Sequence, residues 1–334
     1  MQKMPHVVII GGGTGSYVVA SGLSRMPVRI SMLMTMVDDG GSNKIIRDEF
    51  GLLPTSGIRQ AIVALSDNQT LLRKLFTYRF HQGGEGLKGM TFGNLFMAAM
   101  ADIMGSQKEG IKETCQLLQV RGNIIPTSYD DVRLVATYED GSQVVGEHHI
   151  DEPSHDGKLK ITHLETKPQA KLNPEAKQVL LDADLIIFGP GDFYTNTIAN
   201  LVVGTIAKTI KKSKAKVLFI TNLMTKYGET YNYTAKDFFQ DLTKYLPLEL
   251  IDYVLINSNF NYPPQTIPLY EKEGSIPVKD NLKPSDLNNH VKLIRTDVLS
   301  RVMPTKDTSD HLKRSMIRHD SNRLATAIMK LLKK

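Results

Sequence analysis

Short apolar runs recur along the chain, and each is followed by a glycine-bearing or polar loop. Residues 7–10, 28–37, 184–188, 216–220 and 253–257 are mostly apolar and include many β-branched side chains. Strands that read as near-continuous apolar runs are typical of a parallel sheet whose two faces are both covered by helices. The pattern therefore predicts an α/β fold built on a mainly parallel, doubly wound sheet.

Helical periodicity fills the stretches between these runs. Ser42 and Thr234 stand at N-cap positions, and Gly51 stands where a helix would end. Residues 81–89 carry four glycines and are predicted to form a mobile loop in the position of a lid. The predicted helices cover residues 17–25, 42–50, 58–66, 71–80, 95–104, 197–211, 235–245, 267–272 and 320–332.

The pattern changes at about residue 119. Asp140-Gly141 makes a hairpin turn between short strands, so we expect an antiparallel β insertion over about residues 119–167. Residues 258–334 are expected to form an irregular, Pro-rich segment with a closing helix. No linker divides the chain, which predicts a single domain over residues 1–334. The strands of this region are expected at residues 124–127, 132–138, 143–149 and 292–294.

The loop after the first strand is rich in glycine. Glycine lets backbone N–H groups approach a phosphate closely, which makes this loop a candidate phosphate cradle. Ser16 and Tyr17 follow it, so the Lys of a P-loop is missing, and the third glycine of the dinucleotide fingerprint is also absent. A tight turn without a ligand is the alternative. The candidate residues are Gly11, Gly12, Gly13, Thr14 and Gly15.

Two carboxylates stand at the end of the second strand. Asp38 and Asp39 are placed to hold a divalent cation or a sugar hydroxyl beside the cradle. A helix-capping turn before Ser42 is the alternative. Asp38 also lies where a ribose-binding carboxylate would stand in an NAD-dependent oxidoreductase, but the broken fingerprint counts against that class.

A second glycine loop follows the strand at residues 184–188. Gly189, Gly191 and Asp192 belong to it, and Asn222 lies in a polar loop after the next strand. In a doubly wound sheet these loops leave the same carboxyl edge, so the two glycine loops should meet across one crevice. If they lay on opposite sides of the molecule, the phosphate hypothesis would fail.

Two further polar residues stand at the starts of predicted helices. Arg59 lies in a first turn, where a cation is unfavourable to the helix dipole unless it faces an anion. It is therefore a candidate partner for a phosphate or carboxylate, or else a solvated surface arginine. Asn94 either caps its helix or presents its amide to a ligand.

Composition narrows the functional class. The chain has 334 residues, a net charge of +6 and no tryptophan, and its lysines and arginines are spread out. This charge suits a phosphorylated ligand, whereas nucleic-acid binding is not expected. The single Cys115 fits a reducing cytoplasm, and no apolar run is long enough to span a bilayer, so we expect no membrane insertion. A joint metal site of His148, His149 and Asp151 is not expected, because adjacent strand residues face opposite ways.

Taken in order, several stretches resemble one known family. That family groups the bacterial gluconeogenesis factors (YvcK-like) with the 2-phospho-L-lactate transferases (CofD-like). Gly40-Gly41-Ser42 after the acidic pair is closer to the gluconeogenesis-factor branch, whereas Tyr17 departs from its pattern. The stretches that carry the resemblance are residues 10–15, 37–42, 53–59, 92–95, 188–195, 221–225, 228–230 and 318–320.

The resemblance implies a Rossmann-like three-layer α/β/α fold that binds a UDP-sugar such as UDP-N-acetylglucosamine. It implies a cytoplasmic regulator of cell shape and morphogenesis during growth on gluconeogenic carbon sources. Whether the chain forms a homo-oligomer is left open. Tyr270 and Arg318 resemble contacts to the UDP-sugar. The transferase branch implies the alternative, a Mg²⁺-dependent transfer of a phospholactyl group from a nucleotide-diphosphate donor, with Asp39 as the catalytic residue at the metal.

Overall fold

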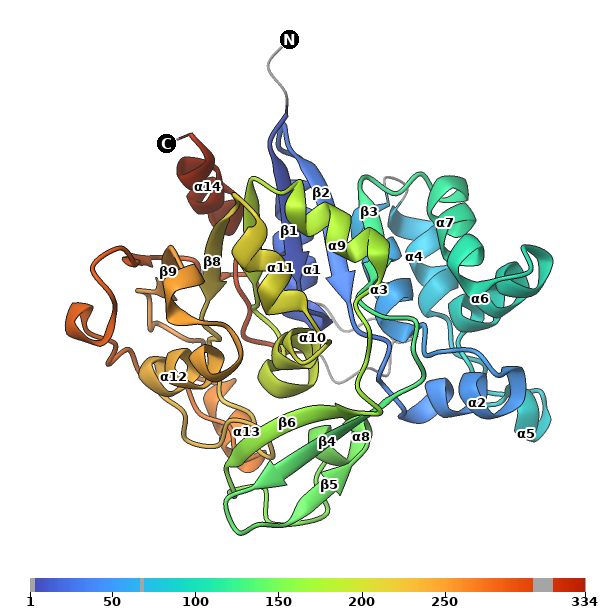
Figure 1. Ribbon diagram of the computed structural model, residues 1–334. Helices are drawn as coiled ribbons and strands as arrows, with labels where there is room; N and C mark the ends of the chain where they lie inside the picture. The colour runs from blue at the N-terminus through green and yellow to red at the C-terminus, as the bar shows by residue number, and fades with distance from the viewer. Residues whose placement is uncertain (1–3, 67–68, 303–314, 334) are drawn as a thin grey trace.

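Seven parallel strands form the central sheet of the computed structural model, which describes residues 4–66, 69–302 and 315–333. Their order is β10-β9-β8-β7-β1-β2-β3, and every neighbouring pair is parallel (Figure 1). The predicted parallel α/β fold is therefore confirmed. The strands are β1 (His6–Ile10), β2 (Arg29–Met34), β3 (Asn123–Pro126), β7 (Leu185–Phe188), β8 (Lys216–Ile220), β9 (Tyr253–Asn257) and β10 (Lys292–Thr296).

The strand order reverses direction between β1 and β7. From β1 the chain continues to β2 and β3 on one side, whereas from β7 it continues to β8, β9 and β10 on the other. The last residues of the two strands, Ile10 and Phe188, are paired in register. The loops that follow β1 and β7 thus leave the sheet side by side, at the switch point where doubly wound folds bind ligands.

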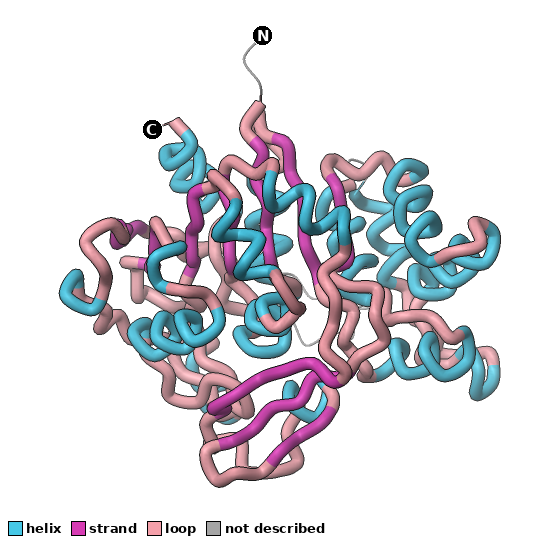
Figure 2. The backbone as a smooth tube through the Cα atoms, viewed as in Figure 1, coloured by secondary structure: helices cyan, strands magenta, loops and turns pink. Residues whose placement is uncertain are grey.

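Helices cover both faces of the sheet, which gives three layers, and Figure 2 looks onto the sheet with the helices of one layer in front of the central strands. Val7 and Ile9 of β1 face one core, and Val8 and Ile10 face the other, because successive strand residues point to opposite faces. The first core packs α1 (Gly13–Leu23), α3 (Ser56–Leu65), α4 (Gln69–Thr77), α6 (Phe92–Ile103), α7 (Gln107–Leu117) and α14 (Ser321–Leu332). The second packs α9 (Pro174–Leu181), α11 (Ile206–Lys212) and α12 (Ala235–Tyr245).

Several helix ends follow the predicted capping residues. Thr234 and Asp237 form a capping box at the start of α12, and Gly51 ends α2 (Gly41–Phe50) with φ of 63°. Among the described residues, no helix is both long and apolar enough to cross a lipid bilayer. The remaining short helices are α5 (Gly84–Leu87), α8 (Glu147–Asp151), the π-helix η1 (Phe193–Ile198), α10 (Ala199–Leu201), η2 (Leu248–Leu250), α13 (Ile267–Lys272) and η3 (Pro284–Asp286).

The predicted insertion is a small antiparallel sheet of three strands, in the order β5-β4-β6. It lies below the carboxyl edge of the main sheet in the view of Figure 1. The insertion begins later than predicted, because β3 pairs in parallel with β2 and belongs to the main sheet. Its strands are β4 (Arg133–Tyr138), β5 (Gln143–Val145) and β6 (Ile161–Lys167).

Three local predictions were wrong. Residues 147–149 are helical rather than extended, because Gly146 takes a φ of 102° and ends β5, after which α8 begins. The predicted helix over residues 197–211 is broken into η1, α10 and α11, since Thr205 adopts a left-handed φ of 70°. Ser42 does not cap α2, because the N-cap residue is Gly40 and Ser42 lies inside the helix. The glycine-rich residues 81–89 contain the short helix α5, and their role as a mobile lid stays a prediction.

Candidate functional site

The two glycine loops pack directly against each other at the switch point. Ser16 Oγ donates a hydrogen bond of 3.0 Å to the carbonyl oxygen of Pro190. A Cβ atom on Gly15 would lie 2.5 Å from that same oxygen, and one on Gly191 would lie 2.6 Å from the carbonyl oxygen of Gly12. The loops therefore meet as the sequence predicted. Glycine is required at these positions for the contact between the loops.

Three helices begin near these loops at residues whose own side chains make no cap, although Asn43 Oδ1 accepts the Ser56 N–H of α3 at 3.3 Å. The N-cap residues of α1, α2 and α3 are Gly12, Gly40 and Thr55, and none of their side chains accepts a cap hydrogen bond. None of the three helices has an acidic residue in its first turn. Since α1 begins at Gly13, Thr14 and Gly15 belong to its first turn. Free N–H groups and the positive ends of helix dipoles favour an anion at this edge.

Arg59 and Asn94 form a buried network behind the first loop. Arg59 is 2% exposed, and its Nε donates a hydrogen bond of 3.1 Å to Asn94 Oδ1. Its Nη1 donates to the carbonyl oxygen of Phe76 at 3.2 Å, so the alternative of a solvated surface arginine was wrong. Burial lowers the pKa of Arg59 to about 10. A ligand contact by Arg59 stays a prediction.

The amide of Asn94 links the starts of two helices. Its Nδ2 donates to Ser42 Oγ at 3.0 Å and to Ser56 Oγ at 3.2 Å, which ties the first turns of α2 and α3 together. The cap of α6 is Thr91, whose side chain accepts from the Asn94 N–H. Tyr17, the residue that departs from the family pattern, donates its hydroxyl to Gly57 O at 3.0 Å in the same region.

The two carboxylates of the acidic pair have different partners. Asp39 accepts one bond from Arg133 Nη1 at 2.9 Å and another from the His148 N–H at 3.0 Å, on its two different oxygens. Both donors belong to the insertion, so Asp39 fastens the insertion to the main sheet. Asp38 accepts from the Gly40 N–H at 3.0 Å, and burial raises the pKa of its carboxyl group.

Three carboxylates that the sequence did not bring together lie around Lys226. Asp151 comes from α8, Asp192 from the second glycine loop and Glu229 from the loop after β8, and one oxygen of each lies within 4.8 Å of the others. The Lys226 ammonium lies 3.1 Å from Glu229 Oε1 and 3.3 Å from Asp192 Oδ1. It also pairs with Asp151. The sequence missed Asp151 because residues 147–149 were predicted to continue a strand.

Glu229 is the buried member of this group. Its side chain is 0% exposed, and Oε2 accepts the N–H groups of Tyr194 at 2.7 Å and Thr195 at 3.2 Å. Burial raises the pKa of Glu229 to about 7, against the opposing effect of Lys226. Burial and the charge of Asp38 raise the pKa of the nearby Glu147 well above its usual value. This side of the crevice therefore carries more acidic than basic groups.

Asn222, Tyr270 and Arg318 lie along the β8 side of the same edge. Asn222 Nδ2 donates to the carbonyl oxygen of Gly191 at 2.7 Å, which fixes the second glycine loop. The Tyr270 hydroxyl accepts the N–H groups of Met316 at 2.8 Å and Ile317 at 3.1 Å, so the segment that ends in Arg318 lies against α13. Tyr270 also packs on an apolar cluster that includes Leu223, Leu299 and Ile317.

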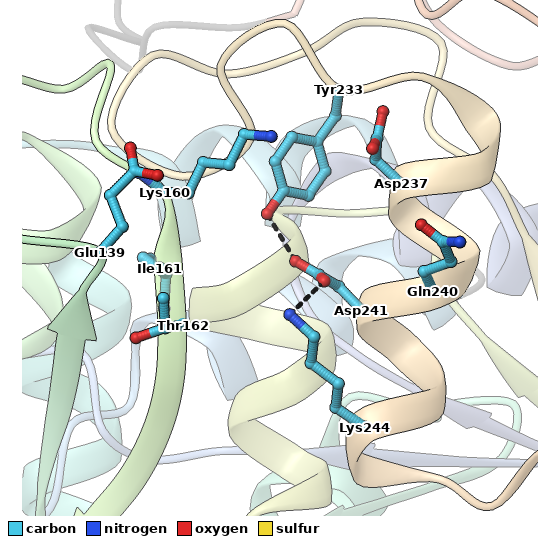
Figure 3. Close-up of a pocket in the computed structure, with 9 residues that line it drawn as sticks. All are labelled: Glu139, Lys160, Ile161, Thr162, Tyr233, Asp237, Gln240, Asp241 and Lys244. Atoms are coloured by element: carbon cyan, nitrogen blue, oxygen red, sulfur yellow. Dashed lines mark hydrogen bonds and ion pairs between the residues drawn. The ribbon is translucent and has the colours of Figure 1, made fainter.

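A separate cavity of about 510 Å³ lies between the insertion and α12 (Figure 3). Asp241 in its wall accepts hydrogen bonds from the hydroxyls of Tyr194 and Tyr233 and pairs with Lys244. Among the described residues, no predicted site residue lines it. The lining residues are Glu139, Lys160, Ile161, Thr162, Tyr233, Asp237, Gln240, Asp241 and Lys244.

The chain is similar to known proteins over most of its length. A family model described as 2-phospho-L-lactate transferase CofD matches residues 7–299. The chain belongs to the CofD family. The gluconeogenesis factor of Bacillus subtilis is 36% identical over 333 residues, which is 100% of both chains. A putative gluconeogenesis factor of Aquifex aeolicus is 40% identical over 262 residues, covering 77% of this chain and 79% of that one.

A solved structure gives the same fold for this CofD-family chain. The crystal structure of a UPF0052-family protein from Bacillus halodurans superposes with a TM-score of 0.87 at 33% identity, covering 98% of this chain and 100% of that one. The family resemblance read from the motifs is confirmed, and so is the layered α/β architecture. The gluconeogenesis factor of Bacillus subtilis covers the chain from end to end.

Proposed function

We propose that this CofD-family chain is a gluconeogenesis factor that binds UDP-N-acetylglucosamine in the crevice at the switch point. The observation that carries the proposal is the direct packing of residues 11–15 against residues 189–191 at the carboxyl edge. Two loops that follow neighbouring strands, one of them opening α1, match the way doubly wound folds hold a diphosphate.

The charge distribution favours an anion only on the side of the crevice where the helices begin. The N-termini of α1 and α2, whose N-cap residues are glycines, supply N–H groups for the diphosphate. The carboxylates around Lys226 on the other side, Asp151 and Glu229 among them, would repel phosphate but are good acceptors for sugar hydroxyl groups. The ligand would therefore lie with its phosphates toward the helices.

Tyr270 and Arg318 are proposed to reach the sugar part of the ligand. The contact between the Tyr270 hydroxyl and residues 316–317 holds the two candidate residues beside each other. Their segment packs on Leu223, which follows β8 directly, so it belongs to the same edge as the second glycine loop. Tyr270 thus both orders the segment that carries Arg318 and offers an aromatic surface to a sugar ring.

The proposed role is that of a cytoplasmic regulator, required for cell shape during growth on gluconeogenic carbon sources. The relative named gluconeogenesis factor in Bacillus subtilis supports this role, since it matches the whole chain. Isothermal titration calorimetry with UDP-N-acetylglucosamine tests the binding step directly. We expect saturable heat at one site per chain. Absence of heat at millimolar ligand would overturn the proposal.

A second candidate is the transferase reaction, favoured by the family model that matches residues 7–299. Oxygen donors suit Mg²⁺, but the Asp39 carboxylate is paired with the Arg133 guanidinium and accepts the His148 N–H, so an ion there would compete with the positive charge of Arg133. Turnover of a nucleotide-diphosphate donor that stops with EDTA and in Asp39→Asn would support this candidate. If neither donor nor acceptor is consumed, the candidate fails.

A further inference from the structure

Lys226 stands where three distant segments of the chain converge. Its ammonium group contacts Asp151 of the insertion, Asp192 of the second glycine loop and Glu229 of its own loop. We infer that Lys226 is the built-in cation of this carboxylate triad: it takes the position that a divalent ion would fill and so fixes the insertion over the crevice. This inference does not depend on the proposed ligand.

The numbers of donors and acceptors match. A lysine ammonium group has three N–H donors, and here three carboxylate groups surround it. Distances of 3.1 Å to Glu229 and 3.3 Å to Asp192 suit N–H···O contacts, whereas Mg²⁺ requires oxygens at about 2.0–2.1 Å. The triad is thus arranged around an ammonium group rather than contracted around an ion.

The turn that carries Lys226 is itself bound to the insertion. Gly228 N donates to Gly157 O at 2.9 Å, and the Tyr227 hydroxyl accepts from the Gly157 N–H at 3.1 Å. Within the turn, Lys226 N donates to Thr230 Oγ1 at 3.0 Å, which orients the start of the lysine side chain. The position of the ammonium group is therefore fixed by backbone contacts as well as by charge.

The charges around Lys226 make it difficult to replace by an uncharged residue. Burial alone would lower the pKa of the ammonium group, but Asp192, Glu229 and Asp151 together raise it well above its usual value. Lys226 is only 28% exposed and Glu229 is fully buried, so removal of the lysine leaves a buried carboxylate beside two others without a cation. Such a group of oxygens would then bind a divalent cation.

The test compares Lys226→Ala with wild type in thermal unfolding, with MnCl₂ or with NaCl at matched ionic strength. We expect Lys226→Ala to lower Tm by roughly 5–10 °C, as for a broken buried ion pair. Millimolar Mn²⁺ should restore at least half of this loss, because it occupies the triad. Wild-type Tm should respond to MnCl₂ no more than to NaCl.

Lys236→Ala is the matched control. Lys236 is also a partly exposed lysine in an ion pair, at 2.7 Å from Asp286, but it meets a single carboxylate. Its variant should lose less stability and should show no rescue by Mn²⁺. A merely structural role for Lys226 would predict the same lack of rescue in both variants, so the rescue distinguishes a cation site from general packing.

Two results would overturn the inference. One is that the wild-type protein binds Mn²⁺ at the triad as tightly as Lys226→Ala does. Paramagnetic broadening of the Tyr194 and Thr195 amide signals measures this binding in both proteins. The other is no effect of Mn²⁺ on the Tm or the soluble yield of Lys226→Ala and Lys226→Gln. The second variant covers the case in which alanine prevents folding. Both outcomes can be measured without UDP-N-acetylglucosamine, so they do not depend on whether the chain binds that ligand.

Discussion

The carboxylate of Asp39 and the guanidinium of Arg133 form an ion pair at 2.9 Å that joins the main sheet to the insertion. Asp39 follows β2, whereas Arg133 opens β4, so the pair crosses the boundary between the two sheets. A second bond, from the His148 N–H, holds the same carboxylate. In this arrangement Asp39 acts as a structural link, and Asp38 is the acid of the pair that lies near the cluster at Lys226.

The first prediction concerns Arg133→Met. The Arg133 side chain is 40% exposed, so solvent weakens the pair, and we expect a loss of about 0.5–1 kcal/mol in the free energy of unfolding. Urea unfolding measures this loss. Lys167→Met, which removes the exposed pair with Glu165, serves as the control and should change stability by less than about 0.5 kcal/mol. Equal losses in the two variants would contradict the linking role of Arg133.

The second prediction concerns Gly15→Ala. The added Cβ would lie 2.5 Å from Pro190 O, so the two glycine loops must separate. We expect a loss of about 1–3 kcal/mol in stability, and binding of UDP-N-acetylglucosamine weakened by roughly tenfold or more, because a binding site needs its parts held within about 0.5 Å. Calorimetry and urea unfolding measure the two effects.

Gly86→Ala is the control for this variant, since an added Cβ there would meet no atom within 4 Å. It should bind the ligand as wild type does. If Gly15→Ala lost stability but bound UDP-N-acetylglucosamine as tightly as wild type, Gly15 would be needed only for packing between the two loops.

The third prediction concerns the buried network at Arg59. Asn94→Ala removes the acceptor of Arg59 Nε and the donors to Ser42 and Ser56, so buried polar groups lose their partners. We expect a loss of about 2–4 kcal/mol in the free energy of unfolding, measured with urea. Asn94→Asp should lose less, since it keeps an acceptor for the guanidinium and the Ser42 hydroxyl can turn to donate to it. The reverse order of the two variants would refute this account.

The fourth prediction is a pH dependence from His319. Burial lowers the pKa of this imidazole from 6.5 to about 4, so the unfolded chain binds the proton more readily than the folded chain. The stability that His319 contributes is therefore complete above about pH 6.5 and is lost as pH falls toward about 4, at up to about 1.4 kcal/mol per pH unit. Urea unfolding between pH 7 and 5 should show a steeper fall for wild type than for His319→Gln. Parallel curves would show that the histidine does not titrate this way.

The main sheet could be predicted closely from the sequence because its strands are buried on both faces. The apolar runs at residues 216–220 and 253–257 coincide with β8 and β9, and the loops after β1 and β7 meet as the topology requires. The prediction failed after the turn at Gly146. A strand was expected to continue to residue 149, but a helix begins there and brings Asp151 to the edge of the sheet. A left-handed glycine ends a strand without any change in the hydrophobic pattern.

The acidic cluster could not be predicted, because its members come from separate parts of the chain. Glu229 and Lys226 lie in a loop that the sequence shows only as polar, and Asp192 was assigned to phosphate binding. No spacing rule relates them to Asp151. The burial of Arg59 could not be predicted for a similar reason: the Phe76 carbonyl that accepts from it belongs to another helix, and sequence does not reveal that partner.

The pairing of β1 with β7 has a consequence for the nascent chain. One wall of the crevice is complete once the first glycine loop has been synthesised, but its partner strand begins only at Leu185, after the whole insertion. A ribosome must therefore release more than half of the polypeptide before the two loops can touch, and contacts so remote in sequence form slowly. Truncated products that stop before β7 would carry the first glycine loop without the second loop against which it packs.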